Sequence, residues 1–333
     1  MHCYKALWLL KTKVVMNGEQ KNIVALFDGM SCGQIALNDI NFKYDNYFAS
    51  EIDKYAKEIT QKNYPNTKQI GSVLDVKGDD LPKTFLMMGG SPCQDLSSSN
   101  VWTEQKGLEG KKSSLFWEYV RLLNELKPKF FLLENVGSAK KSDIEIIDRE
   151  LEVKGIKFNS KLVLPQNRNR VYWTNIPFEL PKDEMGLTMQ DLLEKQVDDK
   201  YYITQKMYDC IISPGTKGWQ SGKMEIDLKI ARPLTATMHK MHRADTDNYI
   251  TGIAPKGKTN VRRLTPIECE RLQGVKDNYT QGVSDTQRYR MLGNGWTVNV
   301  IAHIFKSLLN EDCEPIPRFT EKVLMNDLFS NAL

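Results

Sequence analysis

The stretch that most constrains the fold runs Phe85-Leu-Met-Met-Gly-Gly-Ser-Pro-Cys-Gln-Asp-Leu-Ser97. Its apolar first half ends at Gly89-Gly90, which predicts a buried strand that breaks into a tight turn. Cys93 follows that turn and so stands at the carboxyl end of the strand, where open α/β sheets bind ligands and carry catalytic residues. A buried structural cysteine is the alternative, because free cysteine is among the most buried residue types and a local cysteine signature does not transfer between families. A catalytic role for Cys93 therefore requires that other parts of the chain supply polar partners for its thiol.

Strand and helix patterns alternate on both sides of this stretch. Short apolar or β-branched runs predict strands, and longer runs with helical spacing predict helices between them. The expected strands are 23–27, 47–50, 85–88, 130–133, 161–164 and 171–174, and the expected helices are 33–39, 54–63, 115–126 and 144–153. Such alternation is typical of an α/β fold with a doubly wound, mostly parallel sheet.

The alternation stops near Pro177, which suggests a division into domains. We expect an extension over 1–20, a first domain over 21–177, a second, smaller domain over 178–260, a returning part over 261–312 and a tail over 313–333. Helical signals resume with Thr265 as N-cap, Pro266 at the first helical position and Glu268 at the third. Residues 297–309 are again apolar at helical spacing.

Composition narrows the class of protein. Of the 333 residues 26% are charged and 41% hydrophobic, which is typical of a globular chain, and the net charge of +4 permits nucleic-acid binding without requiring it. The six cysteines form no CxxC pair, so we expect neither a metal site nor a disulfide framework. Free cysteines of this kind are typical of a protein in the reducing cytoplasm. No stretch reaches the roughly 20 apolar residues of a membrane span. The first residues lack a signal-peptide cleavage site, and Met16 is an alternative start.

A second informative stretch, Phe27-Asp28-Gly29-Met30-Ser31-Cys32-Gly33, joins the first expected strand to the first helix. Its glycines allow a tight turn and close approach of backbone to a ligand, but it is not the GxGxxG pattern of a pyrophosphate loop. Glu51 ends the second strand, where an acidic side chain suits ribose hydroxyls. Together they favour a cofactor that contains a nucleoside, whereas separately Asp28 suits an N-cap and Glu51 a solvated strand end.

Four further clusters carry polar residues that the fold alone does not require. Glu134 directly follows the strand over 130–133, and Gln166-Asn-Arg-Asn-Arg170 places two arginines on one side of an extended chain. The other two clusters are Arg262-Arg-Leu-Thr-Pro-Ile-Glu-Cys-Glu-Arg-Leu-Gln-Gly274, which opens a helix, and Tyr289-Arg-Met-Leu-Gly-Asn-Gly-Trp296, which precedes the last one.

These motifs, in this order, resemble the C5-cytosine DNA methyltransferase family, bacterial or phage type, over about residues 22–310. The Asp28-Gly29 loop, Gly90–Cys93 and Gly295-Trp296 also resemble its animal de novo branch. The resemblance implies a Rossmann-like S-adenosylmethionine-dependent methyltransferase sheet with a smaller target-recognition domain. It also implies S-adenosyl-L-methionine as the cofactor, with contacts from Phe27, Asp28, Gly29, Met30, Ser31, Cys32, Gly33, Glu51, Ile52, Ser72, Val73, Gly90, Pro92, Asn294, Gly295 and Trp296. The family often has Asp where this chain has Ser72, so either Ser72 with backbone groups or Asp75 is expected to hold the adenine.

The family's chemistry gives the polar residues their expected roles. Cytosine C5 is a poor nucleophile, and addition of the Cys93 thiolate to C6 makes it enamine-like. A neutral Glu134 would donate to N3, while Arg170 and Arg168 would bind O2 and a phosphate. The base has to leave the duplex, and the polar stretch 94–114 has the length of a functional lid, with surface disorder as the alternative.

The expected partner is double-stranded DNA, bound by a monomer in the cytoplasm of a bacterial or phage-infected cell. A cognate restriction endonuclease is an optional further partner, with no direct contact implied. We expect DNA contacts from Gln94, Ser97 and Ser98 in the lid and from Thr235, Lys240 and Arg243 in the recognition region. A tRNA cytosine methyltransferase, a thymidylate synthase and an inactive DNA-binding protein are the alternatives. The second lacks the loop at 27–33 and the arginine cluster, and the intact Cys93, Glu134 and Arg170 argue against the third.

Overall fold

The computed structural model describes residues 20–92, 115–213, 224–240 and 243–319. Its centre is a seven-stranded sheet in the order β3-β2-β1-β4-β5-β7-β6. The strands are β1 (Asn22–Leu26), β2 (Asn46–Ser50), β3 (Lys68–Gly71), β4 (Thr84–Gly90), β5 (Phe130–Val136), β6 (Ile156–Asn159) and β7 (Asn169–Thr174). The first five strands are parallel, whereas β7 runs antiparallel to β5 and β6. The expected α/β sheet is therefore confirmed, with an antiparallel pair at one edge.

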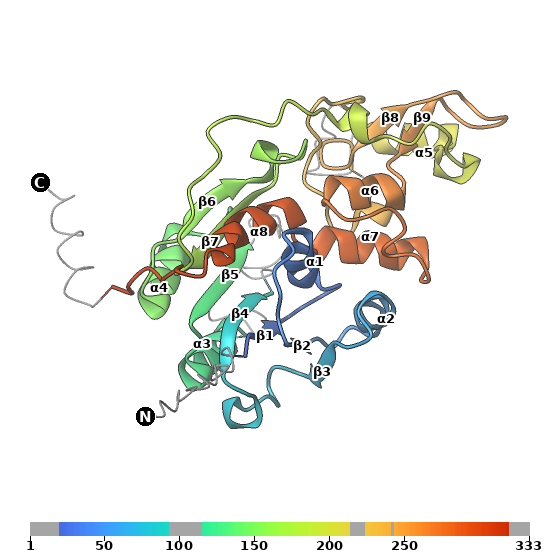
Figure 1. The fold of residues 1–333 in the computed structure, drawn as a ribbon. Coiled ribbons are helices and arrows are strands. Elements are labelled where there is room, and N and C mark those ends of the chain that lie inside the picture. Colours follow the sequence, from blue (N-terminus) through green and yellow to red (C-terminus); the bar gives the residue numbers. More distant parts are fainter. Residues whose placement is uncertain (1–19, 93–114, 214–223, 241–242, 320–333) are drawn as a thin grey trace, which may run out of the picture.

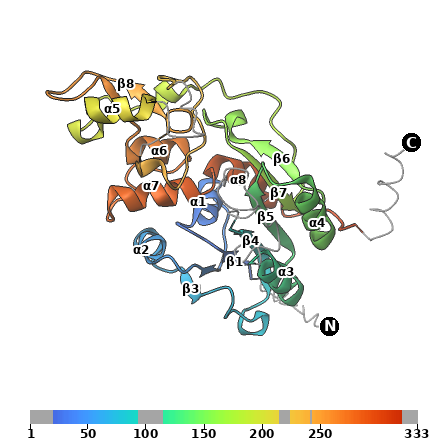
Figure 2. The same cartoon turned by 180° about the vertical axis from the view of Figure 1, so that it is seen from behind.

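Helices cover both faces of this sheet. Successive side chains of β1 point alternately into two hydrophobic cores, one on each face. Ile23 and Ala25 belong to a core that includes α1 (Cys32–Asp39), α2 (Lys54–Asn63) and α8 (Val298–Phe305). Val24 and Leu26 face a second core built with α3 (Leu115–Leu126) and α4 (Lys141–Leu151). Figures 1 and 2 show α3 and α4 together on one side, and α1 and α8 on the other. The sheet is thus buried on both faces, which explains the continuous apolar runs of its central strands.

The chain from 178 onward builds a second group of elements beyond α1, at the end of the sheet away from α3 and α4 (Figure 1). These elements are α5 (Gln205–Ile212), the two-stranded sheet of β8 (Tyr249–Thr251) and β9 (Val261–Arg263), α6 (Pro266–Leu272) and α7 (Asp285–Asn294). Thr265 caps α6 with Pro266 in its first turn, and Glu268 completes a capping box, so that expectation is confirmed. A small separate core lies under β8 and β9.

Two details of the expected strands are wrong. Residues 161–164 form no strand: β6 ends at Asn159, and 3-10 turns over Ser160–Leu162 begin the return to β7. The side chain of Asn159 accepts the backbone N–H of Lys161 and so fixes that reversal. Glu134 does not follow its strand but lies within β5, opposite Tyr172 of β7, because the antiparallel partner extends the pairing to Val136.

Helices of membrane-spanning length and apolarity are absent from the described parts of the chain.

Candidate active site

A pocket of about 300 Å³ opens at the carboxyl ends of the parallel strands. It lies beyond β1 and β4, where the order of the strands reverses, which is the usual ligand site of open α/β sheets. Its lining comes from the loops after β1, β2 and β4, from the end of β5, from the start of β7 and from the end of α7. The expected residues among the lining are Phe27, Asp28, Gly29, Met30, Cys32, Glu51, Gly90, Pro92, Glu134, Arg168, Arg170, Asn294, Gly295 and Trp296.

The loop after β1 is strongly bent around Asp28. Phe27, Gly29 and Ser31 all have positive φ, which is an unusual conformation for a phenylalanine and a serine. The Asp28 carboxylate accepts hydrogen bonds from the Ser31 hydroxyl and, at 2.7 Å, from the Tyr47 hydroxyl. Burial raises the pKa of Asp28 to about 7; the two hydrogen bonds oppose this rise, and the nearby charge of Glu51 adds to it. The pocket therefore contains a carboxyl that changes its charge near neutral pH.

Glu51 ties the loops after β1 and β2 together. Its Oε2 accepts the Gly29 N–H at 2.7 Å, and its Oε1 accepts the N–H groups of Ile52 and Asp53, also at 2.7 Å. A carboxylate oxygen has two acceptor sites, so Oε2 retains one for a ligand hydroxyl.

The carboxyl group of Glu134 contacts two side chains from different parts of the chain. Arg170 of β7 forms an ion pair with it, with Nε 2.9 Å from Oε1, and Trp296 donates a hydrogen bond through Nε1 to Oε2 at 2.9 Å. The Glu134 and Arg170 side chains are 12% and 18% exposed, so this ion pair is largely shielded from solvent. The structure thus brings three of the expected site residues into one cluster.

The backbone just before Cys93 is fixed by a side chain of β5. Asn135 donates through Nδ2 to the Ser91 hydroxyl at 3.1 Å, and Pro92, the residue before the cysteine, lines the pocket. Cys93 itself lies outside the described residues, as do Gln94, Ser97, Ser98 and the whole expected lid over 94–114. A different thiol, Cys32, lines the pocket, and burial raises its pKa to about 12, so it stays neutral at physiological pH.

Arg168 and Arg170 have different surroundings although they lie two residues apart. The guanidinium of Arg168 donates to the backbone carbonyls of Leu234, Gly293 and Gly295 at 2.7 to 3.0 Å. Gln166 and Gln273, both fully buried, bond to each other and add further bonds to the same loops. These contacts favour a structural role for Arg168, which joins the segment near Leu234 to the turn between α7 and α8.

Several expected cofactor and DNA residues lie away from the lining. This group consists of Ser31, Gly33, Ile52, Ser72 and Val73, together with Thr235, Lys240 and Arg243. The Ser72 hydroxyl accepts the Leu74 N–H, Val73 packs into the core with α3 and α4, and Ile52 is 76% exposed. Arg243 donates to the Thr237 hydroxyl at 3.0 Å, whereas Lys240 is exposed.

Sequence reasoning missed other contributors to the pocket. Tyr47 holds Asp28, Asn135 holds Ser91, and the exposed Arg290 of α7 adds a positive charge to the lining. Gly293 lets the Thr235–Ala236 backbone approach α7, since a Cβ there would lie 2.1 Å from the Thr235 carbonyl carbon. Arg290 is one turn before Gly293 on α7, which is the only signal that could have identified it.

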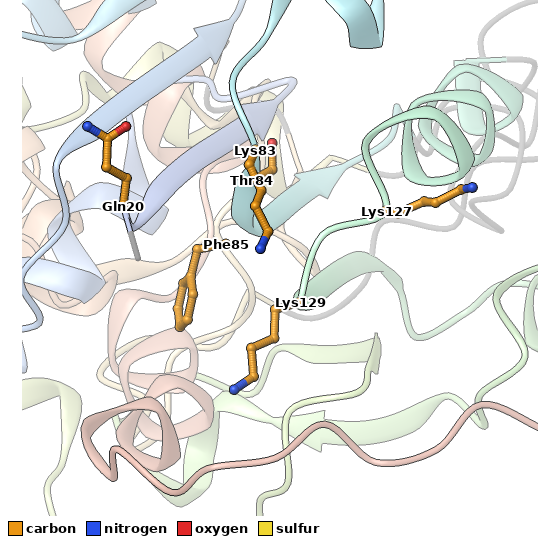
Figure 3. A pocket seen from close by; sticks show the side chains of 6 residues that line it. All are labelled: Gln20, Lys83, Thr84, Phe85, Lys127 and Lys129. Atoms are coloured by element: carbon orange, nitrogen blue, oxygen red, sulfur yellow. The ribbon is translucent and has the colours of Figure 1, made fainter. Parts of the chain in front are cut away.

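Another pocket, of about 240 Å³, lies at the opposite, amino-terminal edge of β4 and β5. It is lined by Lys83, Lys127 and Lys129 with Gln20, Thr84 and Phe85. Figure 3 shows the lysine side chains pointing in different directions, and Lys129 pairs with Glu314 at 3.3 Å. Because its cations do not converge, we assign it no function.

Comparisons of the sequence with known proteins agree with the chemistry of the pocket at the carboxyl ends of the strands. The family model described as C-5 cytosine-specific DNA methylase matches residues 21–310. The type II methyltransferase M1.ScrFI of Lactococcus lactis subsp. cremoris is 30% identical over 314 residues, covering 86% of this chain and 77% of that protein. The type II methyltransferase M.HhaI of Haemophilus parahaemolyticus is 28% identical over 314 residues, covering 84% and 92%.

Solved structures share the fold. The Entamoeba histolytica methyltransferase EhMeth superposes with a TM-score of 0.69 at 22% identity, over 88% of this chain and 100% of that one. The S. pombe Dnmt2 methyltransferase superposes with a TM-score of 0.66 at 17% identity, over 87% and 98%. At these identities the likeness concerns the arrangement of helices and strands.

Proposed function

The chain belongs to the C-5 cytosine-specific DNA methylase family, and on this premise we propose that it methylates C5 of a flipped-out cytosine through a covalent bond between Cys93 and C6. The observation that carries the proposal is the cluster of Glu134, Arg170 and Trp296 at the mouth of the pocket. A carboxyl group held by Arg170 and Trp296, in the pocket that Pro92 also lines, is suited to recognise a base presented to the following cysteine.

Enzymes of this family use S-adenosyl-L-methionine in general, and the pocket has features that fit it. Asp28 and Glu51 supply negative charge and a hydroxyl acceptor, which suit a cationic cofactor with a ribose. Gly90 leaves no room for a side chain, since a Cβ there would lie 2.8 Å from the indole nitrogen of Trp296. We assign cofactor contacts to the expected residues that line this pocket; when bound, the cofactor supplies the methyl group.

The residues of the chain would then act on the base. The Cys93 thiolate adds to C6 while Glu134 gives its proton to N3, so that the electron pair of the C5–C6 double bond becomes available at C5. After C5 is methylated, a water molecule takes the C5 proton, the electron pair of the C5–H bond restores the C5–C6 double bond as the thiolate leaves C6, and N3 returns its proton to Glu134. Arg170, which already contacts Glu134, is placed to bind O2, and the exposed Arg290 is suited to a phosphate.

The DNA would lie between the sheet and the elements of the second group. We propose residues 178–260 as the recognition region, with Thr235, Lys240 and Arg243 near the DNA, residues 94–114 as the lid, and a monomer acting in the bacterial cytoplasm. The named relatives are type II methyltransferases, which supports a place in restriction and modification, next to a cognate endonuclease. The division into domains at 177, 260 and 312 stays a prediction.

The decisive experiment is expression in a host that lacks cytosine methylation, followed by bisulfite sequencing of the DNA. We expect protected cytosines in one short sequence context. Cys93→Ala should abolish protection while DNA and cofactor binding persist, because only the thiolate is removed. Protection by Cys93→Ala at the wild-type rate would refute the covalent mechanism, and unprotected DNA with methylated RNA would favour a tRNA cytosine methyltransferase.

A further inference from the structure

We propose that Trp296 is a positioning residue for the reaction: its indole N–H fixes the carboxylate of Glu134 and stabilises the charge that remains after Glu134 gives up its proton. The inference rests on the proposed function and deepens it. The sequence suggested Trp296 only as a cofactor contact, and the new role concerns the acid that activates the base.

Each carboxylate oxygen of Glu134 has its own partner, a hydrogen-bond donor on one oxygen and an ion-pair partner on the other. Trp296 Nε1 lies 2.9 Å from Oε2, and Arg170 Nε lies 2.9 Å from Oε1. Hydrogen bonds to an ionised acceptor are roughly twice as strong as neutral ones. Both contacts therefore stabilise the negative charge that develops on Glu134 as its proton moves to N3. Such preorganised donors lower a barrier without rearranging during the reaction.

The indole nitrogen is packed closely against the end of β4. A Cβ on Gly90, the last residue of that strand, would lie 2.8 Å from Nε1. The absence of a side chain at Gly90 thus makes the space that the indole N–H occupies.

The backbone around Trp296 is fixed as well. The Gly295 carbonyl accepts from Arg168 at 3.0 Å and from Gln273 at 3.1 Å, and the Thr297 hydroxyl donates to Gln273 at 2.9 Å. The Gly293 carbonyl accepts a further bond from Arg168 at 3.0 Å. Because the residues before and after Trp296 are held by buried side chains, the indole N–H keeps its direction toward Glu134.

The first test compares Trp296→Phe with Trp117→Phe in steady-state methylation. Phenylalanine retains an aromatic ring and removes the donor, and Trp117 is a partly exposed tryptophan on α3, away from the pocket lining. Loss of one hydrogen bond to a charged group should lower kcat about tenfold in Trp296→Phe, with KM for S-adenosyl-L-methionine within about twofold, as expected for a donor used on the base side. Trp117→Phe should keep both values. A raised KM with unchanged kcat would overturn the proposal.

A double-mutant cycle tests whether Trp296 acts through Glu134. In a Glu134→Gln background the acceptor is neutral, so Trp296→Phe should change the residual kcat less than about twofold. An equal tenfold loss in both backgrounds would overturn the proposal, since Trp296 would then act independently of Glu134.

A spectroscopic readout needs neither substrate nor turnover. Of the six tryptophans, Trp296 is identified by the indole N–H signal that Trp296→Phe removes from a ¹⁵N-correlated spectrum. We expect Glu134→Gln to shift that signal more than any other indole signal, and an unshifted signal would overturn the contact. If the wild-type protein methylates no cytosine, the proposed function and the catalytic part of this inference fail, whereas the indole signal still decides the contact.

Discussion

Asp28 couples the charge of the pocket to the stability of the fold. Its pKa is raised from 3.8 to about 7, mainly by burial. Between these values the folded protein holds a proton that the unfolded chain releases, so the free energy of unfolding falls as pH rises through this window and is level above it. A pKa difference of about three units corresponds to about 4 kcal/mol of unfolding free energy. We expect a fall of about 2 kcal/mol, roughly half of that value, because the carboxyl partly faces the pocket and is screened by solvent there.

Asp28→Asn tests this expectation, since the amide does not titrate. Urea denaturation between pH 4 and pH 8 should show the variant gaining about 2 kcal/mol relative to the wild type across that range. Asp75→Asn, at an exposed position, is the control and should run parallel to the wild type. Parallel curves for all three proteins would contradict the assignment to Asp28.

Gly90 is the residue on which the contact between Trp296 and Glu134 depends. A Cβ would lie 2.8 Å from the indole nitrogen and 3.0 Å from Glu134 Oε2, closer than side chains tolerate. Gly90→Ala should therefore destabilise the fold by about 1–3 kcal/mol and lower methylation at a temperature where the variant remains folded. Gly186→Ala, with no atom within 4 Å of its Cβ but with a φ of 74°, should lose some stability through backbone strain alone and retain activity. Full activity in Gly90→Ala would mean that the cluster is not needed.

At the scale of the element, the start of α6 concentrates buried charge. Glu268 is fully buried, and its two oxygens accept from both Nη atoms of Arg262 at 2.8 Å, and also from the Thr265 and Glu194 N–H groups. Glu268→Gln should cost about 3–5 kcal/mol, since it leaves the guanidinium of Arg262 buried without a counter-charge. Thr265→Ala should cost only about 1 kcal/mol, as for other N-caps. Equal losses in chemical denaturation would contradict this ranking.

The same scale shows how far sequence reasoning reaches. The cap of α6 was predictable because Thr265, Pro266 and Glu268 are neighbours in the chain and their roles follow from local geometry. The strand expected at 161–164 failed because the antiparallel pairing of β6 with β7, a tertiary fact, decides where the chain reverses. The clamp of Arg168 on Gly293 and Gly295 joins residues more than 120 positions apart. Spacing within a motif carries no information about such a contact.

At the scale of the whole molecule, one hydrophobic core joins the sheet to the second group of elements. It extends from Ile23 of β1 through Leu234 and Ile250 to α6, α7 and α8. The Gln166–Gln273 pair and Arg168 add buried hydrogen bonds across the same boundary. The two parts should therefore unfold together, with equal calorimetric and van't Hoff enthalpies in a reversible scan. Two separate transitions would show that residues 178–260 fold independently.

Cofactor binding should move this single transition as a unit. A ligand that binds only the folded state at a hundred times its Kd stabilises it by about 2.7 kcal/mol, which corresponds to a rise in Tm of roughly 4 °C for a chain of this size. The shift should appear equally in the near-UV signal of the sheet's buried Trp173 and in the far-UV signal of the whole chain, because the pocket is lined by β-strand loops and by α7 alike. Glu51→Gln should weaken the response, since Glu51 both holds the Gly29 loop and offers the remaining acceptor. A shift seen by only one of the two probes would contradict the coupling between the sheet and the helices that follow it.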